Sequence, residues 1–240
     1  TKNVRKYRDI FQNYKTWFCV SNDLTNSMKK HFPEFSNRIQ TFPHIINVRQ
    51  IKTSGIEYTA DWPGKGLRLL SVGRLETQKG FDLIPAIARK LSENRVEFQW
   101  AILGEGPKHS MIEKTIVEYG LSQQVFLLGA KENPYPYFAS CDIYVQPSRY
   151  EGYCLTLAEA RVFFKPIVAT YFDGSNEQLE GGKCGKIVKC EIGELFLAVK
   201  ELCDKPQLRA AYTEALKHQN IENSRGSEIF IEEVRKSVDC

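Results

Sequence analysis

From about residue 64 onward, short apolar runs alternate with segments of helical periodicity. Several of the runs are apolar at successive positions, which is typical of parallel strands covered on both faces. The predicted strands are Leu67–Val72, Phe98–Leu103, Val125–Leu128, Ile143–Gln146, Pro166–Thr170 and Lys186–Val188. The predicted helices are one bearing Phe81, Ile84, Ile87, Ala88 and Leu91 as an apolar stripe, and those at Pro107–Tyr119, Pro134–Ser140, Cys154–Phe164, Glu191–Cys203, Gln207–His218 and Ser227–Val238.

This repetition of strand and helix predicts an α/β protein with a doubly wound, Rossmann-like parallel sheet and a helical C-terminal tail. In such sheets ligands bind at the carboxyl ends of the strands. The loops that directly follow the predicted strands are therefore the places to look for chemistry.

The first 60 residues have a different organisation. Strands are predicted near Thr16–Val20 and Ile39–Phe42, with a helix over Asp23–His31 between them, capped by Ser21 or Asn22. One βαβ unit cannot bury its own core, so we expect it to pack on something else. The turn-rich stretch Lys52–Gly66 is the predicted linker. We therefore divide the chain into residues 1–62, the βαβ unit plus the linker, and residues 63–240.

Composition narrows the class of protein. Hydrophobic residues make up 42% of the 240 residues and charged residues 26%, which is globular and excludes a disordered chain. No apolar run approaches the ~18–20 residues of a membrane span. The seven cysteines include no Cys-x-x-Cys pair, so we expect reduced thiols in a cytoplasmic protein. The four histidines include no His-x-x-x-His pair, so we expect no metal site.

Charge is unevenly distributed along the chain. Residues 1–50 hold nine Lys/Arg and three Asp/Glu, a balance of +6, whereas the remainder holds 24 and 26, a balance of −2. A nucleic-acid-binding surface over the whole protein is therefore not expected. The basic surplus includes Lys2–Tyr14, which could form an amphipathic helix.

The first motif after a strand is Gly73-Arg74-Leu75-Glu76-Thr77-Gln78-Lys79-Gly80. Its glycines allow close backbone approach, and Arg74 and Lys79 place two cations at a helix start, where anions are favoured. The competing interpretation is a solvated loop in which these cations pair with Glu76 and Asp82. A second, weaker motif is Gly104-Glu105-Gly106-Pro107, which most often is only a turn.

The third motif runs from Pro147 to Ala160 and contains Glu151 and Glu159. Two carboxylates beside a phosphate site make sense if they accept hydrogen bonds from sugar hydroxyls while Arg74 and Lys79 offset the phosphate charge. The alternative is structural, with Glu151 complementing a helix dipole and Glu159 paired with a neighbouring lysine. A fourth motif, Asp173-Gly174-Ser175-Asn176-Glu177, is predicted to open a helix, with Glu177 as a first-turn charge.

Four patterns occur in one order: Gly-Arg-Leu-x4-Gly, Gly-x-Gly-Pro, Pro-Ser-x-x-Glu-Gly-x-x-Leu-x-x-x-Glu-Ala and Pro-x-Val-Ala-Thr. Over roughly residues 64–240 the chain strongly resembles the C-terminal, donor-binding domain of group 1 (family 4) retaining glycosyltransferases, which have the GT-B fold. Residues 16–51 resemble the last βαβ unit of the family's N-terminal, acceptor-binding domain.

The resemblance implies a role for each matching residue. Glu151 would meet hydroxyls of the donor sugar and is the candidate catalytic residue, and Glu159 would hold the ribose. The candidate diphosphate ligands are Arg74 and Lys79 beside Gly73, and the backbone amides at Gly152, Tyr153, Cys154 and Leu155. The loop with Gly104 and Gly106 and the turn Gly129–Lys131 would lie beside the nucleobase.

The same resemblance implies sugar transfer from a UDP-, GDP- or ADP-sugar to a sugar or glycolipid acceptor, with retention of configuration and no bound cofactor or metal. Such enzymes serve polysaccharide or glycolipid assembly. Family members are about twice the size of a single domain, so most of the acceptor domain would lie before Thr1, and this chain alone should not transfer sugar.

Three departures from the family pattern leave the donor open. Cys154 stands where the family often has glycine, Phe164 precedes Lys165-Pro166 where Gly-x-Pro is usual, and His44 replaces a common asparagine.

Three other functions are weighed against the enzyme. One is a nucleotide-sugar-binding module without transfer activity. Another is a peripheral protein of the inner membrane face that binds through Lys2–Tyr14, although packing of its aromatic residues on the missing domain is favoured. A NAD-dependent dehydrogenase is disfavoured, because no dinucleotide fingerprint follows any predicted strand.

Overall fold

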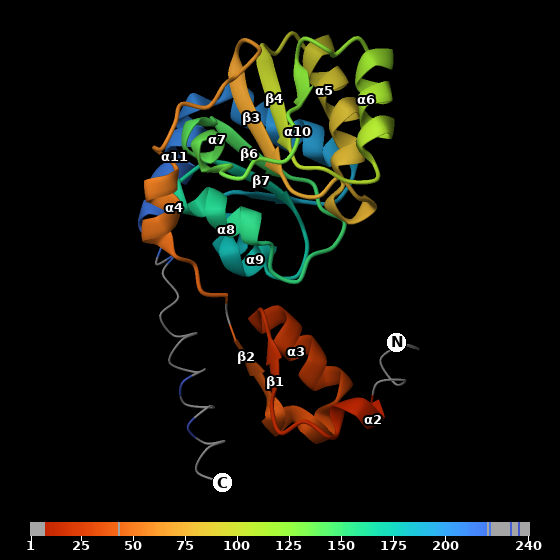
Figure 1. Ribbon diagram of the computed structural model, residues 1–240, viewed down its shortest axis with the longest axis vertical. Helices are drawn as coiled ribbons and strands as arrows, with labels where there is room; N and C mark the ends of the chain where they lie inside the picture. The colour runs from red at the N-terminus through yellow and green to blue at the C-terminus, as the bar shows by residue number, and fades with distance from the viewer. Residues whose placement is uncertain (1–7, 43, 220, 222–230, 232–234, 236–240) are drawn as a thin grey trace. The chain divides into compact units, whose positions relative to one another are not determined.

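The computed structural model describes residues 8–42, 44–219, 221, 231 and 235 (Figure 1). The described residues fall into two compact units, a smaller one within residues 1–45 and a larger one within Ile46–Glu222. Each unit is described by itself.

The larger unit is built on a six-stranded, fully parallel sheet of order β5-β4-β3-β6-β7-β8. The strands are β3 (Leu67–Val72), β4 (Phe98–Leu103), β5 (Val125–Leu127), β6 (Ile143–Gln146), β7 (Ile167–Thr170) and β8 (Lys186–Val188). Register is set by pairs such as Leu70 with Ala101 on one side of β3 and with Tyr144 on the other. The predicted doubly wound, Rossmann-like fold is thereby confirmed.

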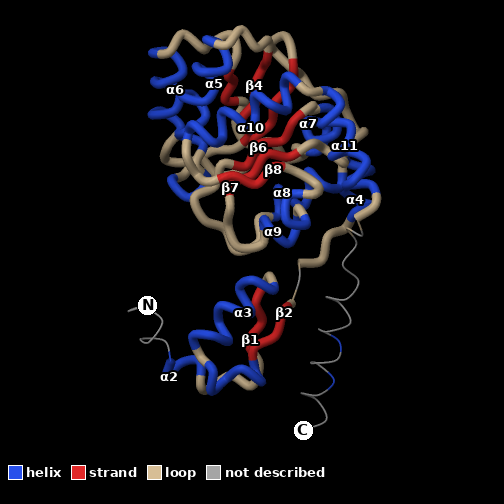
Figure 2. The backbone as a smooth tube through the Cα atoms, turned by 180° about the vertical axis from the view of Figure 1, so that it is seen from behind, coloured by secondary structure: helices blue, strands red, loops and turns tan. Residues whose placement is uncertain are grey.

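Helices cover both faces of this sheet (Figure 2). They are α4 (Val48–Ser54), α5 (Ile84–Glu93), α6 (His109–Glu118), α7 (Tyr135–Ser140), α8 (Leu155–Val162), α9 (Ser175–Gln178), α10 (Ile192–Asp204) and α11 (Pro206–Lys217). Buried residues of α5, α6 and α10 join one core cluster, whereas buried residues of α7 and α8 join the cluster on the opposite face.

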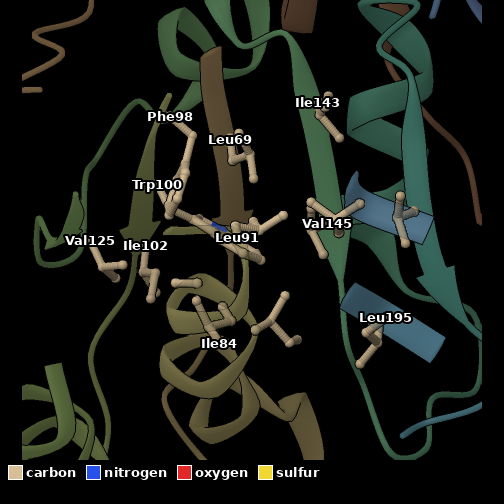
Figure 3. Close-up of a cluster of buried hydrophobic side chains, with 14 of the residues drawn as sticks. Leu69, Ile84, Leu91, Phe98, Trp100, Ile102, Val125, Ile143, Val145 and Leu195 are labelled. Atoms are coloured by element: carbon tan, nitrogen blue, oxygen red, sulfur yellow. The ribbon is translucent and has the colours of Figure 1, made fainter. Parts of the chain in front are cut away.

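The two cores explain why the strands are apolar at successive positions. Alternate residues of one strand point to opposite faces, so Leu69 enters one core and Leu70 the other, and both are fully buried. On the first face, Ile84 and Leu91 of α5 lie against the strands around Trp100 (Figure 3). The Trp100 indole N–H is also satisfied, because it donates to the Ser71 hydroxyl at 3.1 Å.

The smaller unit contains β1 (Trp17–Cys19), α3 (Asn22–His31) and β2 (Ile39–Thr41), with a parallel β1–β2 pair, as predicted for a βαβ unit. Of the two predicted caps of α3, Ser21 is the cap: its hydroxyl accepts from the Leu24 N–H at 3.2 Å. The predicted helix Lys2–Tyr14 falls partly outside the described residues, within which α2 spans Arg8–Phe11.

The predicted linker Lys52–Gly66 is wrong in part, since it overlaps helix α4, which sequence reasoning did not predict. Asn47 caps α4 by accepting from the Gln50 N–H at 3.0 Å, and buried Ile51 anchors it. Because α4 packs on α7 and α8, the boundary between packing units lies at Ile45/Ile46. The functional division at residues 62 and 63 stays a prediction about the whole protein.

The C-terminal tail is helical through α10 and α11, whereas the predicted helix Ser227–Val238 lies outside the described residues apart from Ile231 and Arg235. Within the described part of the chain, no helix has the length and apolarity that crossing a bilayer requires.

Candidate functional site

The site lies where the strand order reverses, between β3 and β6. At such a point the loops leaving neighbouring strands turn to opposite faces and open a crevice at the carboxyl ends. The loops after β3 and β6 touch, because the Arg149 N–H donates to the Gln78 carbonyl at 2.8 Å. Gly80 has φ 70°, and a Cβ there would lie 1.9 Å from the Pro147 carbonyl oxygen, so glycine is required where these two loops meet.

Lys79 and Glu151 form a largely buried ion pair between the loops after β3 and β6. Lys79 Nζ lies 2.6 Å from Glu151 Oε1, and the two side chains are 17% and 8% exposed. Burial by itself would lower the pKa of Lys79, but Cys154, Glu151 and Glu76 together raise it above its usual value. The ammonium is therefore held in its charged form. One cation from the β3 loop thus meets one carboxylate from the β6 loop.

A series of hydrogen bonds through Gln146 and Ser148 holds the carboxylate of Glu151 in place. The Ser148 hydroxyl donates to Glu151 Oε1 at 2.9 Å, and the Gln146 amide donates to that hydroxyl at 2.8 Å. The Gln78 amide reaches Glu151 Oε2 at 3.4 Å. A carboxylate offers about four acceptor positions, so Glu151 retains capacity on Oε2 for a further donor such as a sugar hydroxyl.

A second ion pair clamps the same two loops together. Arg149 donates to both carboxylate oxygens of Asp82 at 2.7 Å and to the Thr77 carbonyl at 2.7 Å. Burial would raise the pKa of Asp82, but the hydrogen bond and charge of Arg149 hold it below its usual value. Sequence reasoning missed this pair, and the alternative in which Arg74 and Lys79 pair with Glu76 and Asp82 is wrong for Asp82, which pairs with Arg149.

Arg74 is the most exposed of the four charged residues predicted for the site. Its side chain is 70% exposed, and its guanidinium lies 3.9 Å from Glu76, a loose contact that agrees with the structural alternative at this position. The β4 loop supports this segment closely: the Leu75 N–H donates to the Glu105 carbonyl at 2.9 Å. A Cβ at Gly104 would lie 1.9 Å from the Gly73 carbonyl oxygen, and one at Gly106 2.5 Å from that of Leu75.

Glu159 lies on α8 and pairs with a tyrosine rather than with the lysine of the structural alternative. The Tyr135 hydroxyl donates to Glu159 Oε1 at 3.2 Å. Burial raises the pKa of Glu159, and the tyrosine hydrogen bond opposes that rise. Burial and the Glu159 charge in turn raise the pKa of Tyr135 to about 12, so this hydroxyl stays a donor.

Helix α8 begins at Leu155 directly after a strained residue. Cys154 has φ 72°, in the left-handed region that favours glycine, and it is buried. Burial, with the charge of Glu151, raises the pKa of its thiol to about 11, so the thiol is neutral near pH 7. Phe164 likewise has φ 53°. Two departures from the family pattern therefore replace glycine at positions whose backbone still has the glycine conformation.

The structure thus joins Lys79 to Glu151 and places the backbone of Gly152–Leu155 beside the fourth motif: a Cβ at Gly174 would lie 3.1 Å from the Gly152 carbonyl oxygen. Among the described contacts, Glu159 forms a separate pair with Tyr135. Glu177 lies in the first turn of α9, as expected. In the described part of the chain, no group of three or more His, Cys, Asp or Glu side chains is arranged to hold a metal ion.

Residues 59–219 match the family model described as glycosyl transferases group 1. This match covers more than half of the chain, so the chain belongs to the group 1 glycosyltransferases, and the predicted family is confirmed.

Curated relatives agree with this assignment. The chain is 32% identical over 149 residues to the alpha-D-kanosaminyltransferase of Streptomyces kanamyceticus, covering 61% of this chain and 39% of the relative. It is 28% identical over 170 residues to the N-acetylgalactosamine-N,N'-diacetylbacillosaminyl-diphospho-undecaprenol 4-alpha-N-acetylgalactosaminyltransferase of Campylobacter jejuni, covering 70% of this chain and 46% of the relative. The chain therefore spans less than half the length of these two relatives.

Solved structures share the fold. A glycosyltransferase from Rickettsia africae superposes with a TM-score of 0.82 at 16% identity, over 99% of this chain and 67% of that one. Anabaena Alr3699/HepE, in complex with UDP and glucose, superposes with a TM-score of 0.77 at 15% identity, over 98% of this chain and 67% of that one. At these identities the likeness concerns the fold alone, which is the GT-B fold of glycosyltransferases.

Proposed function

We propose that this chain binds the nucleotide-sugar donor of a retaining glycosyltransferase. The observation that carries the proposal is the Lys79–Glu151 pair, 2.6 Å apart at the reversal of strand order. A diphosphate is bound by cations and N–H groups, whereas a sugar is bound by hydrogen-bond acceptors. Here a cation, Lys79, and an acceptor, Glu151, are in direct contact.

The proposed roles follow from the chemistry of these groups. Lys79, Arg74 and the first-turn N–H groups of α8 neutralise the diphosphate, whose charge grows as it leaves the sugar. Glu151, already held by Ser148 and Lys79, accepts hydrogen bonds from hydroxyls of the sugar. Glu159 holds the ribose. This set of charges supports donor binding without a metal, so the binding heat should survive EDTA.

A calorimetric panel of UDP, GDP and ADP, free and as sugar conjugates, tests the proposal. We expect at least one to bind, and Arg74→Ala to weaken binding by ~1.5–3 kcal/mol, because a charge-assisted contact to phosphate is lost. Arg89→Ala on α5 is the matched control, since Arg89 pairs with Glu93 outside these loops. Equal affinity of wild type and Arg74→Ala would remove Arg74 from the site.

Glu159 offers a second, more graded test. We expect Glu159→Gln to weaken nucleotide binding less than Glu159→Ala, because glutamine still accepts one hydrogen bond from a ribose hydroxyl. Burial raises the pKa of Glu159, so its carboxylate is protonated earlier when the pH is lowered. As the pH falls, the wild-type affinity should therefore begin to decrease at a pH above the usual titration range of glutamate. Equal losses in the two variants, measured by calorimetry across pH, would indicate a purely structural carboxylate.

The acceptor and the place of action are also proposals. The name of the Campylobacter jejuni relative describes a substrate linked to diphospho-undecaprenol. We infer a sugar or glycolipid acceptor, and action in the cytoplasm at or near the membrane in polysaccharide or glycolipid assembly. Because catalysis requires donor and acceptor to be held together, the 240-residue chain alone should bind donor without transferring its sugar.

A further inference from the structure

The fourth motif opens a short helix, α9, whose last residue reaches into the loop before α8. Both views show α9 next to α8 (Figures 1 and 2). Gln178 is 2% exposed, and its side-chain N–H groups donate to the carbonyl oxygen of Tyr153 and, at 3.5 Å, to that of Cys154. A buried side-chain amide thus grips two successive peptide groups.

These two peptide groups are the ones that present N–H groups at the start of α8. Because a trans peptide is planar, its carbonyl and the following N–H point in opposite directions. Holding the Tyr153 carbonyl therefore sets the direction of the Cys154 N–H, and holding the Cys154 carbonyl sets that of Leu155. The grip matters at this place, since Cys154 has φ 72° and a strained residue persists only where its surroundings hold it.

Arg161 of α8 holds Gln178 in turn. Its side chain is buried, with 8% of the residue exposed, and it donates to Gln178 Oε1 at 3.4 Å and to Gln219 Oε1 at 3.0 Å. Arginine only donates, so the oxygen of the Gln178 amide must face Arg161. Its NH₂ group is thereby directed at the carbonyl groups of Tyr153 and Cys154.

We propose that Gln178, oriented by Arg161, is a positioning residue that aims the backbone N–H groups of Cys154 and Leu155 at the donor phosphate. The proposal rests on the proposed binding of a nucleotide sugar. The competing interpretation is that Gln178 merely satisfies the buried Arg161 guanidinium.

Gln178→Glu separates these two interpretations. A glutamate would pair with Arg161 at least as well as glutamine does, but it cannot donate to the two carbonyl groups and repels them. We expect the affinity for UDP, or for whichever of GDP and ADP the wild type binds better, to fall about five- to twentyfold. The melting temperature should stay within about 2 °C. If Gln178 only satisfies Arg161, affinity stays unchanged and the melting temperature holds or rises.

The matched control is Gln99→Glu on β4. Gln99 is also buried, but its side-chain oxygen accepts from the Gly64 N–H at 3.0 Å, a bond that a carboxylate can keep. This variant should bind the nucleotide as the wild type does. A wild type that binds none of the three nucleotides would contradict the proposed function, whereas binding that Gln178→Glu leaves unaltered overturns the positioning role alone.

If Gln178→Glu fails to fold, a measurement on the wild-type chain tests the positioning role instead. In an NMR titration of the ¹⁵N-labelled chain with the same nucleotide, the N–H resonances of Cys154 and Leu155 should be among those that shift most. The Gln178 side-chain NH₂ resonances should persist unchanged. Shifts elsewhere in the crevice without shifts at these two backbone groups would overturn the proposal.

Discussion

Replacing Lys79 with methionine is expected to destabilise the chain by about 2–4 kcal/mol, because it leaves the Glu151 carboxylate, only 8% exposed, without its cation. The same change should lower the affinity for a nucleoside diphosphate by about 2–3 kcal/mol, since a charged donor to phosphate is lost. Urea unfolding and calorimetry measure the two effects separately.

The control for this change is Lys114→Met on α6, where the lysine is exposed and no ion pair is recorded among the described contacts. It removes the same charge away from the crevice and should alter neither quantity appreciably. The double variant Lys79→Met/Glu151→Gln should regain most of the lost stability, because the unpaired carboxylate is gone, but not the affinity. Recovery of both would mean that Lys79 serves only to neutralise Glu151.

Replacing Glu151 with alanine should have opposite effects on two ligands. For a nucleotide sugar we expect the binding free energy to weaken by about 2–4 kcal/mol relative to that of the free nucleoside diphosphate, because the sugar hydroxyl groups lose a charged acceptor. For the free nucleoside diphosphate, affinity should hold or rise, since the Lys79 ammonium no longer shares its charge with a carboxylate. Calorimetry with matched ligands, UDP-glucose and UDP for example, gives both numbers.

Glu118→Ala on the exposed surface of α6 is the control for the removal of one negative charge. If Glu151→Ala weakened the affinity for the nucleotide sugar and for the free nucleoside diphosphate equally, a role of Glu151 in sugar recognition would be contradicted. That result would favour the structural interpretation, in which Glu151 only orders the β6 loop.

The Lys79–Glu151 pair also explains why carboxylates can stand beside a phosphate site. Glu151 pairs with Lys79 and accepts hydrogen bonds from Ser148 and Gln78, so these donors balance its negative charge before any ligand binds. Asp82 is likewise neutralised by Arg149. The cost of two carboxylates near a diphosphate is thus largely offset within the two loops themselves.

The secondary structure of the larger unit could be predicted from the sequence because it depends on local spacing. The boundaries of β3, β4, β6 and β8 agree with the prediction to the residue. In β4 and β6 every residue is buried, which a run of mostly apolar residues indicates. Helix α4 was missed because its seven residues follow a cap, Asn47, but carry no repeated apolar stripe. Its stability comes from packing on α7 and α8, which local sequence does not reveal.

The candidate site divides in the same way. The sequence by itself determined the family, the strand-end loops and the charged residues in them, because these depend on motif order and on the rule that ligands bind where parallel strands end. Only the tertiary structure decided which polar groups meet: Lys79 with Glu151, Asp82 with Arg149, Glu159 with Tyr135 and Gln178 with the carbonyl groups before α8. These partners lie 24 to 72 residues apart in the sequence, and their pairing follows from strand order, which no local pattern encodes.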